Sequence, residues 1–270
     1  YGVAYIALGK FKDAKVCLDD AMELAEKSMK NLYWTSTAHS DLALYYFYNW
    51  KPLGKATSAE QIIYEFEKAI SDYQNFGKPD VSRDIEMAWH RAFLHILKED
   101  YQSACNDAED CIHLSQANSQ AYGLSRGYNL QSLAYLKNGD IDAARDSLEE
   151  GLHACEMYAF PAGIFRMYNN LGVVSCQNGD FAKAGAFFSL ALDCVDQQLE
   201  YKQFPILTNL LLVGMHLKDE KLLQRAQKYC DEIPSEDLMR YRRSLRPGTL
   251  QSGTVESFAF FGFSGISYLF

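Results

Sequence analysis

The sequence lacks the short motifs by which several common enzyme sites are recognised. It contains no GxxxxGK[ST] phosphate-binding loop, no HExxH metal motif and no GxGxxG dinucleotide-binding fingerprint. Its six histidines are scattered, and His90 and His95 stand five residues apart, which places them on different faces of a helix. Because no paired acid and base or activated nucleophile is recognisable, we expect a non-catalytic chain that holds no cofactor and no metal.

The chain also lacks the features of an exported or membrane-spanning protein. It has no secretory signal, no Asn-x-Ser/Thr acceptor site and no run of 18 apolar residues. Its seven cysteines form no CxxC pair and stand within apolar helical stretches, which favours small buried side chains over a disulfide framework. We therefore expect a cytoplasmic protein that does not associate with a membrane.

An excess of positive charge is missing as well. The chain has 26 Lys and Arg against 35 Asp and Glu, which gives a net charge of −9 and a pI near 5.2. An acidic chain repels phosphate backbones, so nucleic-acid binding is not expected.

A short phrase of sequence, by contrast, returns about every forty residues. Residues 139–144 (GDIDAA) recur as 179–184 (GDFAKA), with related versions at 9–14 (GKFKDA) and 99–104 (EDYQSA). Glycine ends a helix well, and the following aspartate is suited to cap the next one. A fixed period of this length predicts stacked helical units.

The residues around this phrase resemble the tetratricopeptide repeat (TPR) family in their spacing. The best-matched unit contains Tyr168, Leu171, Gly172, Gly179, Phe181, Ala184, Phe188 and Ala191. The units at 128–151 and 1–21 also match, although Gln131 and Ser132 stand where the family has Leu-Gly. The period is near 40 rather than the usual 34 residues. This long form resembles the arrays of STAND-type signalling ATPases and of peptide-sensing regulators.

The predicted fold is therefore all-α, a right-handed α-solenoid of about six TPR-like helix pairs over 1–233. A C-terminal segment, 234–270, contains a basic stretch and an aromatic, Gly- and Ser-rich tail that is expected to be irregular or β-like. Helices are expected near 1–8, 12–30, 33–49, 57–76, 80–98, 100–117, 120–137, 140–157, 161–177, 180–199, 204–217 and 219–231. Pro79, Pro161 and Pro205 are expected at or near helix starts.

In TPR arrays the first helix of each pair lines a concave groove, and the resemblance implies candidate ligand-binding residues here. Arg126 and Asn129 recur forty residues later as Arg166 and Asn169. An arginine can hold a carboxylate with two hydrogen bonds, and an asparagine amide can pair with a peptide backbone. Pairing with neighbouring helices or with solvent is the alternative. The other positions that the resemblance places in the groove are Leu133, Leu136, Lys137, Asn170, Val173, Cys176 and Gln177. The preceding unit has Glu86, Trp89, Phe93 and Ile96 at equivalent places, as an apolar patch beside the polar one.

Two C-terminal features are further candidates for partner contact. Arg240, Arg242, Arg243 and Arg246 form a basic cluster on an acidic chain. They can contact a partner or dock on the solenoid itself. The aromatic tail at 254–270 can pack on the last helical unit or on another chain.

The sequence as a whole predicts a protein- or peptide-binding module. Tyr1 already stands at the Leu position of a repeat, so we expect a piece of a longer chain whose other regions hold an activity or mediate oligomerisation. The resemblance implies a ligand-sensing segment of a larger bacterial signalling or defence protein of the STAND type. The alternative is a passive scaffold subunit of a multiprotein complex.

Overall fold

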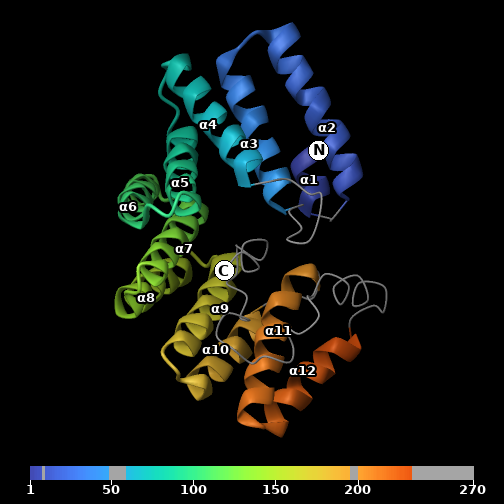
Figure 1. Cartoon of the computed structure of the whole chain (residues 1–270), viewed down its shortest axis with the longest axis vertical. Coiled ribbons are helices and arrows are strands. Elements are labelled where there is room, and N and C mark those ends of the chain that lie inside the picture. The colour runs from blue at the N-terminus through green and yellow to red at the C-terminus, as the bar shows by residue number, and fades with distance from the viewer. Residues whose placement is uncertain (8–9, 49–58, 195–199, 233–270) are drawn as a thin grey trace. The chain divides into compact units, whose positions relative to one another are not determined.

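A computed structural model describes residues 1–7, 10–48, 59–194 and 200–232 (Figure 1). Within these residues every regular element is a helix. The elements are α1 (Gly2–Ala7), α2 (Phe11–Glu23), the π-helix η1 (Leu24–Met29), α3 (Leu32–Tyr48), α4 (Ala59–Phe76), α5 (Val81–Leu97), α6 (Tyr101–Ala117), α7 (Ala121–Lys137), α8 (Ile141–Met157), α9 (Pro161–Gln177), α10 (Phe181–Cys194), α11 (Glu200–Leu217) and α12 (Glu220–Glu232).

The repeated phrase acts at the turns between helices. Gly139 and Gly179 have φ values of +85° and +78°, a conformation that glycine adopts without strain. The Asp140 carboxylate accepts a hydrogen bond from the Ala143 amide at 3.0 Å, and Asp180 accepts one from Lys183 N at 3.0 Å. Each aspartate thus caps the helix that follows it. Local sequence therefore sets these helix boundaries.

The chain divides into two compact units, which we describe separately. Unit 1 contains α1–α6 and ends at Asn118, and unit 2 begins at Ser119 and contains α7–α12. In unit 1, α3 packs on α4 and α5 packs on α6. In unit 2 the pairs are α7 with α8, α9 with α10 and α11 with α12, and α8 and α10 also pack on the helix that follows each of them.

A hydrophobic core joins consecutive pairs in unit 2. Ala144, Leu148 and Cys155 of α8 pack with Met167, Leu171 and Val174 of α9, and all six side chains are at most 3% exposed. Leu171, which with Gly172 matches the Leu-Gly positions of the family, belongs to this core. A Cβ atom placed on Gly172 would lie 2.4 Å from the Phe188 ring, so only glycine allows α9 and α10 to approach this closely.

The predicted all-α solenoid of TPR-like helix pairs is confirmed. Eleven of the twelve predicted helices begin within two residues of the observed start, and α11 is the exception. It begins at Glu200 instead of 204, and Pro205 is its sixth residue. Proline favours the first helical position, and Pro205 lies past the first turn of α11. The predicted domain boundary at 233/234 and the tail at 234–270 lie outside the described residues.

Candidate ligand-binding surface

Four buried asparagines form a chain of hydrogen bonds across the first helices of three pairs in unit 2. The Asn170 amide donates to Asn129 Oδ1, which links α9 to α7. Asn169 Nδ2 donates to Asn170 Oδ1 at 3.0 Å, and Asn209 Nδ2 of α11 donates to Asn169 Oδ1 at 2.9 Å. The exposed fraction of each side chain is 4% or less. We call this set, Asn129, Asn169, Asn170 and Asn209, the asparagine ladder.

The asparagine ladder gives the predicted asparagines an observed role between helices. Side-chain hydrogen bonds connect Asn129, Asn169 and Asn170. Contact of these residues with a ligand stays a prediction. The prediction from sequence did not include Asn209. One further step of forty residues from Asn129 and Asn169 reaches it, so the period itself was the signal.

The two predicted arginines lie in the N-terminal halves of α7 and α9. Arg166 Nη1 donates to Ser125 Oγ at 3.0 Å, and Ser125 directly precedes Arg126 in α7. The Arg126 guanidinium lies over the Tyr122 ring, 5.1 Å from its centroid. Both arginines are half-buried. Two residues of α7, Tyr122 and Ser125, thus contact the guanidinium groups of Arg126 and Arg166.

Aromatic side chains border these arginines. Tyr122 is 56% exposed. Its ring meets that of Phe160, the N-cap residue of α9, edge to face, with the ring centroids 6.4 Å apart. A guanidinium held over a tyrosine ring is restricted in its orientation, and guanidinium groups suit planar acceptors such as carboxylates. We call Tyr122, Arg126, Phe160 and Arg166 the arginine–aromatic surface.

The remaining predicted positions of α7 and α9 differ in exposure. Lys137, in the last turn of α7, is half-buried, as is Leu136, and Gln177 at the end of α9 is exposed. Leu133, Val173 and Cys176 are at most 3% exposed. Burial raises the pKa of the Cys176 thiol to about 12. Lys137 and Gln177 therefore remain the candidates for contact at this end of the helices.

The predicted patch in α5 lies mostly inside unit 1. Trp89 stacks on Phe93 with ring centroids 5.4 Å apart and planes 13° apart, and Phe93 meets Phe66 edge to face at 5.5 Å. Trp89 is 8% exposed, and Phe93 and Ile96 are 0% and 1% exposed. These side chains form the aromatic core between α4 and α5. Ligand contact by Trp89 and Phe93 stays a prediction, and only Glu86 of this set is half-buried.

One sequence pattern was not recognised from the sequence. Residues 123–127, Gly-Leu-Ser-Arg-Gly, have the GxSxG form of a turn that carries a nucleophilic serine. That chemistry requires the serine on a strained strand-to-helix turn, beside a histidine base. Here the whole pattern lies inside α7, and Ser125 is 0% exposed and bonded to Arg166. Ser125 therefore does not stand on the strand-to-helix turn that this motif requires.

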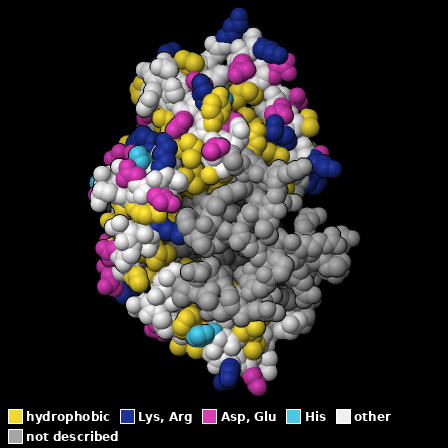
Figure 2. Space-filling model, in the orientation of Figure 1, with side chains coloured by type: hydrophobic (Ala, Val, Ile, Leu, Met, Phe, Trp, Pro, Cys, Tyr) yellow, Lys and Arg dark blue, Asp and Glu magenta, His cyan; other side chains and the backbone are white. Residues whose placement is uncertain are grey.

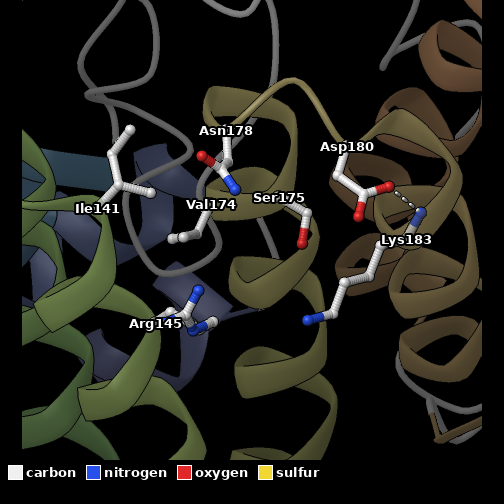
Figure 3. A pocket seen from close by; sticks show the side chains of 7 residues that line it. All are labelled: Ile141, Arg145, Val174, Ser175, Asn178, Asp180 and Lys183. Carbon is white, nitrogen blue, oxygen red and sulfur yellow. Dashed lines mark hydrogen bonds between the residues drawn. The ribbon is translucent and has the colours of Figure 1, made fainter.

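A small polar depression lies between α8, α9 and α10 of unit 2 (Figure 3). Arg145 of α8 and Lys183 of α10 approach it from opposite sides, with Ser175 of α9 between them. Its volume is about 50 Å³, too little for a peptide, and Arg145 is already paired with Asp142 at 3.0 Å. Its other lining residues are Ile141, Val174, Asn178 and Asp180. These residues come from three helices and from the turn between α9 and α10, so no short sequence motif contains them.

Charged side chains of both signs occur on the face of the described chain that Figure 2 shows. Figure 2 shows acidic, basic and hydrophobic side chains interspersed over one face. Within the described ranges no three His, Cys, Asp or Glu side chains gather as a metal site, and no helix is long and apolar enough to cross a bilayer. The predicted contact residues Arg240, Arg242, Arg243 and Arg246 lie outside the described residues.

Comparison with known proteins agrees with the repeat pattern. The tetratricopeptide repeat family profile matches residues 1–28 and 125–154. A sequence search of the curated proteins finds no significant match.

Solved structures share the fold at low sequence identity. BtubC (BKLC) from P. vanneervenii is 16% identical with a TM-score of 0.58, over 89% of this chain and 94% of that one. The apo form of RapI is 12% identical with a TM-score of 0.59, over 87% and 80%. A Signal Transduction ATPase with Numerous Domains (STAND) from Pyrococcus horikoshii, with a tetratricopeptide repeat sensor, is 14% identical with a TM-score of 0.56, over 88% and 36%. The chain therefore carries tetratricopeptide repeats, matched directly at 1–28 and 125–154, within an all-α solenoid of similar helix pairs.

Proposed function

We propose that the chain is a non-catalytic module that binds a protein or peptide on the arginine–aromatic surface of unit 2. The observation that carries the proposal is the placement of Arg126 and Arg166. They stand one repeat apart, and both are positioned by α7, one on the Tyr122 ring and one on Ser125. Two oriented guanidinium groups at the repeat spacing suit a ligand that presents acceptors along an extended chain.

The surroundings of the arginines favour binding by a preformed surface. The asparagine ladder joins α7, α9 and α11 next to this surface, so the helices that carry both arginines are fixed to each other. Tyr122 and Phe160 add exposed or half-buried aromatic area beside the charges. Binding to a rigid surface orders few side chains and so loses little conformational entropy. Lys137 and Gln177 extend the proposed contact toward the other end of the helices.

We further propose that the module is the ligand-sensing segment of a larger cytoplasmic signalling or defence protein of the STAND type. Support comes from the fold it shares with the tetratricopeptide repeat sensor protein of Pyrococcus horikoshii, of which this chain spans about a third. In such a protein, ligand binding to the repeats would release or assemble a catalytic region elsewhere. Neither nucleic acid nor a membrane is the proposed partner.

The test is affinity purification of the full-length protein from its native cells, with bound proteins identified by mass spectrometry. The variant is Arg126→Ala with Arg166→Ala, and the matched control is Arg145→Ala, another half-buried arginine of unit 2 that lies on α8. We expect a partner that is lost from the double variant and kept by the control, with melting temperatures close to wild type.

Two other outcomes would count against the proposal. A partner kept by the double variant would exclude the arginine–aromatic surface as its binding site. A partner that co-purifies constitutively, from a protein without any catalytic region, would favour the passive scaffold instead of a sensor.

A further inference from the structure

The polar depression of unit 2 brings two cationic side chains from different helices to one place. The Arg145 guanidinium of α8 and the Lys183 ammonium of α10 point toward one another across the space beside Ser175 of α9 (Figure 3). The side chain of Asn178, the C-cap residue of α9, directs its amide nitrogen into the same space. Nitrogen donors therefore converge on the depression from three directions.

The Lys183 ammonium lies beside an aromatic ring instead of a carboxylate. Lys183 belongs to the first turn of α10, and its Nζ stands over the Phe187 ring, 5.5 Å from the centroid. It forms no ion pair with any residue that the structure describes. A cation–π contact restricts an ammonium group without neutralising its charge. An anion in the depression would therefore meet a positive charge that no described carboxylate balances.

Arg145 is paired with two exposed carboxylates of its own helix. Its Nη2 lies 3.0 Å from Asp142 Oδ1 and 3.5 Å from Asp146 Oδ1. The side chains of these aspartates are 80% and 67% exposed, and ion pairs at such positions contribute little to stability. A guanidinium has five N–H donors, and both contacts use the same nitrogen. Arg145 can thus bind an anion through its other nitrogens, or exchange these partners at little cost.

Two further polar groups line the depression, and both are engaged within their own helices. The Asp180 carboxylate accepts a hydrogen bond from Lys183 N at 3.0 Å, and it points to this amide on the side away from Arg145 (Figure 3). Ser175 is 8% exposed, and its hydroxyl donates to Leu171 O at 2.8 Å. Because a hydroxyl hydrogen rotates, Ser175 can donate instead to a bound anion.

The depression has the size of one small anion. Its volume is about 50 Å³, whereas one water molecule requires roughly 10–15 Å³. A carboxylate presents two oxygens in one plane, while a phosphoryl group presents three strong acceptor oxygens in different directions. Donors on three sides of a small space fit the phosphoryl group better.

We propose that Arg145, Lys183 and Asn178 form a binding site for a single phosphoryl group, either inorganic phosphate or a phosphate monoester. The two cations balance its charge, the asparagine amide orients it, and the bound anion joins α8 to α10 across the end of α9. The site lies apart from the arginine–aromatic surface. Arg166 is the sixth residue of α9 and Asn178 follows its last, which separates them by about 18 Å along the helix. The proposal is therefore independent of the function proposed above.

Titration of the full chain with inorganic phosphate, followed by backbone amide NMR, tests the site. Ionic strength is kept low and constant with sodium chloride, because salt screens exposed charges. We expect saturable shifts at residue 145 and at 175–183. Lys183→Gln should weaken phosphate binding by about tenfold, the effect of losing one hydrogen bond from a charged donor. The matched control is Lys221→Gln, which removes an exposed lysine from the first turn of α12, beside the capping Asp219, and should bind phosphate like wild type.

Two further measurements define the ligand and separate the sites. Phosphoserine that competes with phosphate would assign the site to phosphoryl groups carried on larger molecules, and phosphate binding without this competition would assign it to the free ion. Arg145→Ala should weaken phosphate binding by about tenfold and still keep the protein partner. The phosphate titration needs no partner, so its failure would not affect the proposed function.

Three results would overturn the phosphoryl site. The first is a set of shifts that does not saturate with phosphate. The second is an equal loss of binding in Lys183→Gln and Lys221→Gln, which would show a response to the general charge of the surface. The third is displacement of phosphate by an equal concentration of acetate, which would show that the site does not select a phosphoryl group.

Discussion

Asn170 donates its side-chain amide to Asn129 across 41 residues of sequence, and this bond ties the first helices of two consecutive repeats together. Asn169 and Asn209 repeat the same connection one unit further along. In a solenoid each unit is stabilised only by its neighbours, so a buried bond between units contributes to the cooperativity of the whole stack.

Removal of one amide from the asparagine ladder should therefore destabilise unit 2. Asn169 bonds to both Asn170 and Asn209, and its replacement by alanine leaves two buried polar groups without this partner. We expect Asn169→Ala to lower the free energy of unfolding by about 2–4 kcal/mol. Urea unfolding followed by circular dichroism measures the change. The control Asn106→Ala, at an exposed position on α6, should change it by less than about 0.5 kcal/mol.

The close approach at Gly172 leads to a second prediction. A methyl group there would lie 2.4 Å from the Phe188 ring, so Gly172→Ala should lower the free energy of unfolding by about 1–3 kcal/mol. Phe188→Leu in the same chain should recover part of the loss, because it removes the clashing ring atoms. Melting curves of the two single variants and the double variant measure the coupling. Additive losses in the double variant would contradict the close contact.

The cysteines should differ in their reactivity. Burial raises the pKa of the Cys176 thiol to about 12, and its side chain is 0% exposed. The thiolate is the reactive form, so Cys176 should resist alkylation by iodoacetamide at pH 8 in the folded protein. Cys17 is half-buried and should react sooner. Mass spectrometry of a time course identifies the modified residues, and unfolding in urea should remove the difference. Equal rates in the folded chain would contradict the burial of Cys176.

The positions of the helices were predictable because the signals that fix them are local. A glycine at positive φ and an aspartate cap, as at Gly139 and Asp140, act within a few residues of each other. The start of α11 was misplaced because the prediction relied on the preference of proline for the first helical position, and Pro205 is the sixth residue of this helix. The family spacing singled out Gly172 and Phe188 as repeat positions, and only the structure shows that the two are in close contact.

The candidate surface was predictable only in part. The forty-residue recurrence of Arg126 and Arg166 singled out two side chains that the structure leaves half-buried. The same recurrence singled out Asn129 and Asn169, which the structure buries in hydrogen bonds. A sequence period shows that two positions are equivalent, but it does not show whether their side chains face a neighbouring helix or the solvent.

The sequence by itself determined the repeat, its period and most of the helix starts. It also showed that the phosphate, metal and dinucleotide motifs are missing. Each of these depends on residues close together in the chain. The tertiary structure alone decided which polar residues meet. Arg83 reaches Ser36 across 47 residues, and Asn209 reaches Asn169 across 40. Hydrogen-bond partners and burial depend on how whole helices pack, and packing brings together side chains that no local pattern connects.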